Sequence, residues 1–186
     1  MTLEIEYRAQ LTEAEFATLA KLLGQRGDDL GQDDKHIWFY VLPDKLLKVV
    51  HNISHDTGKI VVKTSRIGSG AAFPETELPI AAADVPTAVR LFDALGYTPH
   101  MHDAHNERHN WRYRGVEIAM KWSQAWGHHA EFEVVLPDDA GPEEVSQGQA
   151  MIASVAAELG VRLMTEEELA EFTRQFEARQ AAASAH

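Results

Sequence analysis

Three short segments place glutamates at alternate positions, and this pattern restricts the fold more than any other feature of the chain. They are residues 3–7, 74–78 and 130–134, and each contains the motif Glu-x-Glu. Side chains two positions apart in a β-strand lie on the same face, so each segment places two carboxylates side by side. Two further copies of the motif fall at predicted helix starts, where the helix dipole accounts for them. The three strand segments predict a sheet with one apolar and one acidic face.

Hydrophobic periodicity predicts several strands and four helices. Strands are expected at 3–8, 36–41, 46–51, 59–64 and 73–80 and within 97–136, where 114–115 form a turn. Helices are expected at 12–24, 84–95, 142–159 and from 165 onward, the first and last opening with a Thr-x-x-Glu capping box. Loops are expected at 27–34 and 67–72. This order predicts an α+β fold built on an antiparallel sheet or barrel, as one domain over 1–180 with a flexible tail at 181–186.

Basic residues also lie inside the predicted strands, so the acidic pairs need not belong to a purely acidic surface. Arg8 shares a face with Glu4 and Glu6. Other basic residues of strand-like segments are Lys48, Lys63, Arg108, Arg112 and Lys121. Such a face could be exposed to water on the outside of a sheet. It could instead line the lumen of a barrel, where the cations would bind phosphate oxygens and the carboxylates would bind a metal ion. Because the chain has no cysteine, hard oxygen ligands favour Mg²⁺ or Mn²⁺.

Charge and hydropathy exclude several classes of partner. The formal net charge of -12 argues against binding a nucleic-acid polymer, which normally requires a basic surface. No apolar run approaches the roughly 20 residues that cross a bilayer, and the acidic N-terminus is unlike a signal peptide. We therefore expect a cytoplasmic protein that makes no membrane contact.

The ordered motifs resemble those of the CYTH superfamily, the triphosphate tunnel metalloenzymes. This family includes class IV adenylate cyclases, thiamine triphosphatases and inorganic triphosphatases. Its Glu-x-Glu-x-Lys strand resembles residues 4–8, and its Leu-Arg-x-Arg strand resembles residues 47–50. Lys63 with the acidic pair 75–77, the basic strand 108–113 and Gly-x-x-x-Glu-x-Glu at 127–133 complete the series.

The resemblance implies an antiparallel eight-stranded β-barrel, a triphosphate tunnel, with amphipathic helices packed outside. It implies metal binding, with Mg²⁺ or Mn²⁺, by Glu4, Glu6, Glu131 and Glu133. It implies catalytic roles for Glu4, Glu6 and Arg8. It implies substrate contacts by Arg8, Lys48, Lys63, Arg66, Glu75, Glu77, Arg108, Arg112 and Lys121.

The implied function is hydrolysis of a phosphoanhydride in a triphosphate-containing small molecule: inorganic, nucleoside or thiamine triphosphate. Two alternatives stay open: a class IV adenylate cyclase that forms cyclic AMP, and a tunnel that binds nucleotide or polyphosphate without turnover. The oligomeric state is also open, with a homodimer as one alternative.

Three positions depart from the family pattern. Arg8 replaces a lysine, Val50 stands where a second arginine is common, and Lys121 stands where an aspartate is expected to help hold metal. Lys121 would remove a metal ligand and add a positive charge. This favours weaker metal binding, a different substrate, or a tunnel that binds its ligand without turnover. The simpler interpretation is a salt bridge from Lys121 to Glu117 or to a tunnel glutamate.

The histidines offer a second, weaker signal. His100, His102, His105 and His109 could bind a transition metal such as Zn²⁺ or Ni²⁺, or could belong to a polar loop between strands. One residue of the pair 128–129 could enter the tunnel as a proton carrier near neutral pH, although a loop role is the simpler expectation.

Overall fold

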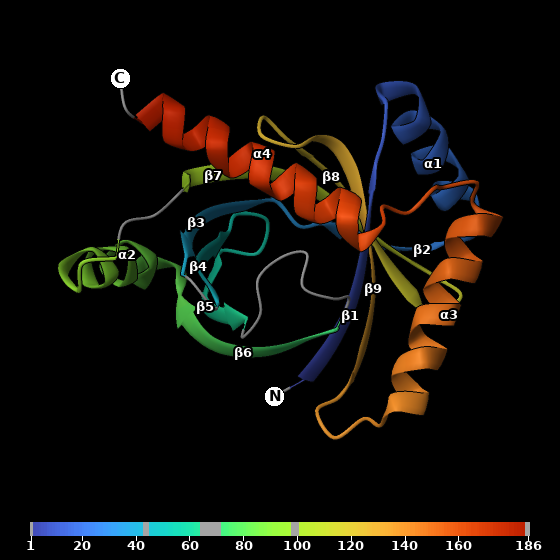
Figure 1. Ribbon diagram of the computed structural model, residues 1–186, viewed down its shortest axis with the longest axis horizontal. Helices are drawn as coiled ribbons and strands as arrows, with labels where there is room; N and C mark the ends of the chain where they lie inside the picture. The colour runs from blue at the N-terminus through green and yellow to red at the C-terminus, as the bar shows by residue number, and fades with distance from the viewer. Residues whose placement is uncertain (1, 43–44, 64–71, 98–100, 185–186) are drawn as a thin grey trace.

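The structure is a computed structural model that describes residues 2–42, 45–63, 72–97 and 101–184. Within these residues, nine strands form an antiparallel sheet in the order β2-β7-β3-β4-β5-β6-β1-β9-β8. β7 also pairs with β8, which closes eight of the strands into a barrel and leaves β2 outside it (Figure 1). The predicted eight-stranded barrel is confirmed, with one additional strand.

The barrel is assembled from strands that alternate with a few helices. The strands are β1 Thr2–Gln10, β2 Asp28–Gln32, β3 Lys35–Val41, β4 Leu46–Asn52, β5 Thr57–Lys63, β6 Ala72–Ala81, β7 Met101–Tyr113, β8 Val116–Ser123 and β9 Gly127–Pro137. The helices are α1 Glu13–Arg26, the short 3-10 helix Ala82–Asp84, α2 Val85–Ala94, α3 Pro142–Glu158 and α4 Glu166–Ser184. None of the described helices is long and apolar enough to span a membrane.

Local signals place the helices close to where we expected them. The predicted capping box opens α1: the backbone N–H of Thr12 donates to Glu15 Oε2 over 2.8 Å, and Glu15 N–H donates to Thr12 Oγ1 over 3.2 Å. Thr165 and Glu168 form the same box at the start of α4. Helix α4 continues to Ser184, beyond the start of the predicted tail.

The expected loop at 27–34 is wrong, because residues 28–32 form β2 on the outer edge of β7. The strand is short and polar, and a bulge between Asp29 and Gly31 breaks its register. Gly31 has a φ of 90°, which an L side chain rarely adopts. A strand without a buried face has no alternating pattern, so periodicity did not reveal it. Most of the other predicted loop, 67–71, lies outside the described residues.

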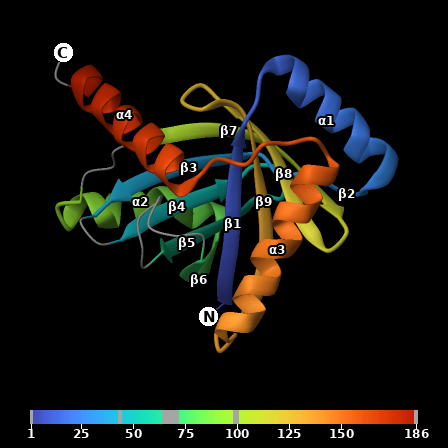
Figure 2. The same cartoon turned by 45° about the vertical axis from the view of Figure 1, so that its right-hand side comes forward.

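The apolar face of the barrel points outward, toward the helices. Helix α3 covers the side formed by β1, β8 and β9, and α1 packs on β2, β7 and β9 (Figure 2). Helix α2 packs on β4 and β5. Ile5 and Phe132 are fully buried in the larger core beneath α1 and α3. Helix α3 approaches β1 so closely that a Cβ at Gly148 would come within 2.6 Å of Ile5 Cδ1. Because the apolar side chains point outward, the alternate, charged positions face the lumen.

Candidate functional site

Strand alternation brings the acidic motifs of β1 and β9 together inside the barrel. Ile5 and Ala9 face the outer core, so Glu4, Glu6 and Arg8 face the lumen. The register of β1 and β9 pairs Glu6 with Glu133 and Arg8 with Glu131. Two segments that are more than 100 residues apart in the chain therefore form one charged wall.

A lysine surrounded by carboxylates forms the first charged group of the lumen, the Lys63 centre. Lys63 Nζ lies 2.5 Å from Glu4 Oε2, 3.3 Å from Glu6 Oε2 and 3.2 Å from Glu75 Oε2. Burial by itself would lower the pKa of Lys63, but the negative charges of these three groups outweigh burial and raise the pKa. This lysine is therefore a fixed positive charge.

A carboxylate surrounded by cations forms the second group, the Glu131 centre. Glu131 accepts hydrogen bonds from Arg8 Nε over 3.0 Å and from Lys121 Nζ over 2.9 Å, and Arg108 Nη1 lies 4.0 Å away. Burial would raise the pKa of Glu131, but the three cations hold it well below its usual value. Lys121 thus makes the salt bridge to a tunnel glutamate that the sequence suggested.

Arg8 connects the two centres and also contacts the rim of the barrel. Its guanidinium forms an ion pair with Glu6 of the Lys63 centre as well as with Glu131. It also lies 5.3 Å from the ring centre of Trp126, in the turn between β8 and β9. Trp126 in turn packs against Phe172 of α4, with ring centres 4.4 Å apart. The C-terminal helix therefore supports a lumen cation through one aromatic side chain.

Glu133 is a lumen carboxyl group whose pKa is raised so far that it keeps its proton at neutral pH. Burial and the negative charges of Glu4 and Glu6 raise the pKa of Glu133 to about 9. A divalent cation beside these three residues would remove that penalty and allow Glu133 to ionise.

The lumen carboxylates are suitable ligands for a hard metal ion, although in this structure several of them form ion pairs with lysine and arginine side chains. In the part of the chain that the structure describes, no group of three or more His, Asp or Glu side chains is arranged so that it could hold a metal ion as it stands. Glu4, Glu6 and Glu133 nonetheless supply the carboxylate oxygens that Mg²⁺ and Mn²⁺ prefer. The ammonium of Lys63 contacts two of them, so an ion would have to displace it.

The remaining predicted site residues are spread along the tunnel. Lys48 makes no ion pair with a described residue, and burial together with the charge of Lys63 lowers its pKa to about 8. Glu77 pairs with Lys59 in a half-exposed position, while Arg112 is exposed and lies 3.9 Å from Glu117. Arg66 lies outside the described residues.

The departure at Val50 has a structural counterpart. Val50 is buried with Ile37 and Val61 on the lumen face of β3, β4 and β5, and Phe39 packs against them. An apolar patch thus takes the place of the second arginine that the family resemblance implied.

The polar loop expected around the histidines at 100–109 is wrong for His105 and His109, which lie in β7. The alternative, a transition-metal site, is not present among the residues that the structure describes. His105 stacks on His36, and His109 contacts Asp29 over 2.6 Å, while His100 and the side chain of His102 lie outside the description. His129 is buried on the lumen face, where burial and the charge of Lys121 lower its pKa to about 4. The loop role expected for residues 128–129 is wrong, because both residues lie in β9. The lowered pKa of His129 does not suit the alternative either, a proton carrier that titrates near neutral pH.

Sequence reasoning missed a third charged group, which surrounds Asp33. This carboxylate follows β2 and lies 2.7 Å from Lys35 Nζ and 3.3 Å from Arg108 Nε. Burial would raise the pKa of Asp33, but these two cations keep it low. The only available sequence signal was that Lys35 alternates with the lumen residues Ile37 and Phe39. The three groups form one ion-pair chain through the lumen: Lys35, Asp33, Arg108, Glu131, Arg8, Glu6, Lys63 and Glu75.

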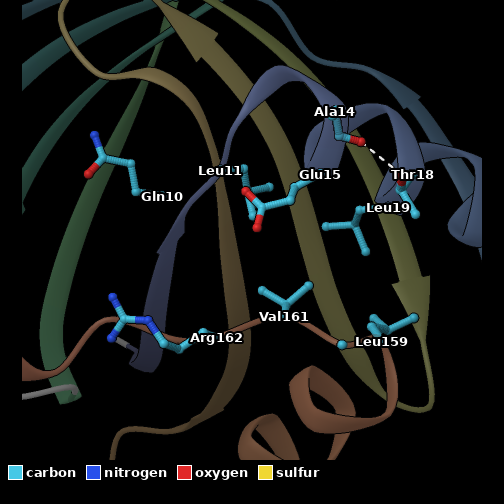
Figure 3. Close-up of a pocket in the computed structure, with 10 residues that line it drawn as sticks. Gln10, Leu11, Ala14, Glu15, Thr18, Leu19, Leu159, Val161 and Arg162 are labelled. Atoms are coloured by element: carbon cyan, nitrogen blue, oxygen red, sulfur yellow. Dashed lines mark hydrogen bonds between the residues drawn. The ribbon is translucent and has the colours of Figure 1, made fainter.

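A separate cavity of about 300 Å³ lies outside the barrel, between α1 and residues 159–162 (Figure 3). Leu11, Leu19 and Val161 supply apolar lining. Its charged groups already have partners, because Glu15 caps α1 and Arg162 pairs with Glu168 over 2.9 Å. This cavity has neither the cations nor the carboxylate pairs of the lumen.

No family model and no curated protein matches the sequence. Solved structures do match. A conserved hypothetical protein from Pyrococcus furiosus has 20% identity and a TM-score of 0.69, covering 89% of this chain and 99% of its own. The chain shares the barrel fold of this protein.

Two further matches carry functional descriptions. A candidate adenylate cyclase from Vibrio parahaemolyticus has 16% identity and a TM-score of 0.66, over 89% of this chain and 91% of its own. A candidate adenylyl cyclase from Hippeastrum, described as having a dominant triphosphatase activity, has 15% identity and a TM-score of 0.61, over 88% and 90%. At these identities the likeness is one of fold.

Proposed function

We propose that the protein binds a triphosphate-containing small molecule in its lumen and hydrolyses a phosphoanhydride bond of that molecule. One observation carries the proposal: Arg8, Lys48, Arg108 and Lys121, from four different strands, face the same enclosed space. Lys48 has no ion-pair partner among the described residues, and the other three share Glu131. The oxygens of a phosphate chain would supply the negative charge that these cations lack.

The cations also suit the chemistry. Phosphoryl transfer needs little covalent help from the protein and depends on positioning and on stabilising the charge of the transferring group. Arg8, Lys121 and Arg108 are already held in place by Glu131, so they need little reorganisation to contact phosphate oxygens. We accordingly give Glu131 the role of orienting these cations, in place of the metal-ligand role that the family resemblance implied.

We further propose that Glu4, Glu6 and Glu133 hold Mg²⁺ or Mn²⁺. The ion would supply Lewis-acid stabilisation of charge on the phosphoryl group. The raised pKa of Glu133 supports this assignment, because a neutral carboxyl beside two carboxylates marks a place where additional positive charge is favourable.

Binding without turnover is the second candidate, and the ion pairs of the Lys63 centre favour it. Lys63 and Arg8 occupy oxygens of Glu4 and Glu6, so a metal must compete with both. The cyclase alternative differs in its products, because it would release cyclic AMP and pyrophosphate from ATP.

A turnover and binding panel separates these functions. Tripolyphosphate, ATP and thiamine triphosphate are each incubated with Mg²⁺ or Mn²⁺, products are identified, and affinities are measured by calorimetry. We expect phosphate release, and about tenfold weaker tripolyphosphate binding for Lys48→Met. Lys21→Met is the matched control, since Lys21 is exposed on α1 and should leave binding unchanged. Binding without product would support the second candidate, and a lack of triphosphate binding would refute both.

A further inference from the structure

Asp33 enters the lumen from outside the ring of barrel strands. It lies in the connection between β2 and β3, and its own backbone N–H donates to Arg108 O over 2.8 Å. Its carboxylate accepts hydrogen bonds from Asn52 Nδ2 over 2.5 Å and from Asn110 Nδ2 over 3.0 Å, besides its ion pairs with Lys35 and Arg108. Four side chains from β3, β4 and β7 thus hold one carboxylate that is only 9% exposed.

Asp33 also lies near one end of the ion-pair chain. Arg108 continues the chain from Asp33 to Glu131, and Lys35 is the last cation in the other direction. Next to the pair lies the exposed ring of His55, with its Nε2 4.0 Å from Asp33 Oδ1. The row of lumen cations therefore ends beside a fixed negative charge.

The surroundings of Asp33 differ from those of Glu131 in net charge. Glu131 is shared by three cations, so that group keeps an excess of positive charge. Asp33 faces two cations, one of which it shares with Glu131. Its side-chain hydrogen-bond donors Asn52 and Asn110 are neutral amides, and the ring of His55 lies 4.0 Å from its carboxylate. A phosphate chain anchored on Arg8, Lys121 and Arg108 and extended toward Lys35 would approach the carboxylate of Asp33, because Asp33 pairs with both Arg108 and Lys35. Like charges that come close together inside a protein repel more strongly than in water.

We propose that Asp33 is a specificity-determining residue that limits the length of the phosphate chain the tunnel accepts. This inference rests on the proposed function, since it presupposes that the lumen binds a triphosphate. The unmodified protein should therefore bind tripolyphosphate more tightly than tetrapolyphosphate, although the longer chain carries more charge.

The test is a chain-length series measured by calorimetry in EDTA, so that metal does not change the charge of the ligand. Pyrophosphate, tripolyphosphate and tetrapolyphosphate are titrated into the full chain and into Asp33→Asn. The asparagine keeps the shape and the oxygen acceptor for Asn52 and removes the charge. We expect it to raise the affinity for tetrapolyphosphate relative to tripolyphosphate by about tenfold. Asp29→Asn is the matched control, because it removes one charge from β2 outside the lumen.

Each outcome decides the question. An unchanged ratio in Asp33→Asn, or an equal shift in Asp29→Asn, overturns the proposal. An equal loss of affinity for every chain length also overturns it and assigns Asp33 to holding Arg108 in place. If Asp33→Asn does not fold, Asp33→Ser removes the same charge and leaves more space. If the unmodified protein binds no tripolyphosphate, the proposed function itself has failed, and that result is seen before any variant is made.

Discussion

The Lys63 centre and the Glu131 centre have opposite arrangements of charge within the same lumen. The first surrounds one cation with Glu4, Glu6 and Glu75, and the second surrounds one carboxylate with Arg8, Lys121 and Arg108. The central charge of each group has three oppositely charged partners, whereas those three side chains share a single central charge. The first centre therefore favours an additional cation and the second an additional anion. A metal ion with a phosphate chain would satisfy both, so the comparison can be tested by breaking each centre separately.

The largest effect should come from the Glu131 centre. Glu131→Gln leaves three buried cations without their shared carboxylate, and we expect it to lower the free energy of unfolding by about 3–5 kcal/mol. Tripolyphosphate should restore part of this loss, since it supplies the missing charge. Urea unfolding with and without the anion measures both effects. Glu117→Gln is the control: Glu117 is more exposed and lies 3.9 Å from Arg108, so its loss should cost about 1 kcal/mol or less.

The converse change, Lys63→Met, should cost somewhat less. The carboxylates left behind can take up protons, whereas the arginines of the other centre cannot lose theirs. Mg²⁺ or mildly acidic pH should restore stability in urea unfolding, and tripolyphosphate should not. Lys59→Met removes a half-exposed lysine from the same strand as a control. If one ligand rescued both centres equally, the contrast between them would be wrong.

Glu133 should make the metal-free protein less stable as pH rises. Its folded pKa of about 9 lies above the ordinary value of 4.5, so between these values the folded protein holds a proton that the unfolded chain has released. Stability is then lost with increasing pH, by at most about 1.4 kcal/mol per pH unit. Glu133→Gln should flatten this dependence in urea unfolding between pH 5 and 9 in EDTA. An equally steep dependence in the variant would contradict the assignment.

The smallest effect is expected at the rim of the Glu131 centre. Trp126→Leu removes the ring that contacts Arg8 and Phe172, and we expect a loss of about 1 kcal/mol, or a fall in Tm of about 2–4 °C. Tripolyphosphate affinity should fall with it. Trp111→Leu removes a comparable stack on His109 away from the lumen and should lower Tm without changing affinity. If the two variants bound tripolyphosphate with equal affinity, Trp126 would have no role in binding.

Alternation along single strands was enough to predict which residues face the lumen. It placed Glu4, Glu6 and Arg8 on one face, and the structure has them there. Alternation could not predict which charged side chains form ion pairs. A contact such as that between Lys63 and Glu6 depends on the positions that strands distant in the sequence take relative to one another when the barrel closes. Asp33 was missed for a related reason, since it belongs to a polar connection that carries no periodic signal.

Closure of the barrel also has a consequence for the solubility of the folded chain. Eight strands have hydrogen-bonded neighbours on both sides, while β2 pairs on one side with β7 and leaves its other backbone edge unpaired. Exposed strand edges are templates on which further strands add, and short, charged or bulged strands are poor templates. β2 has five residues, begins with Asp28 and Asp29, and is bulged at Gly31. The one open edge in the described sheet is thus poorly suited to capturing a strand from a neighbouring molecule.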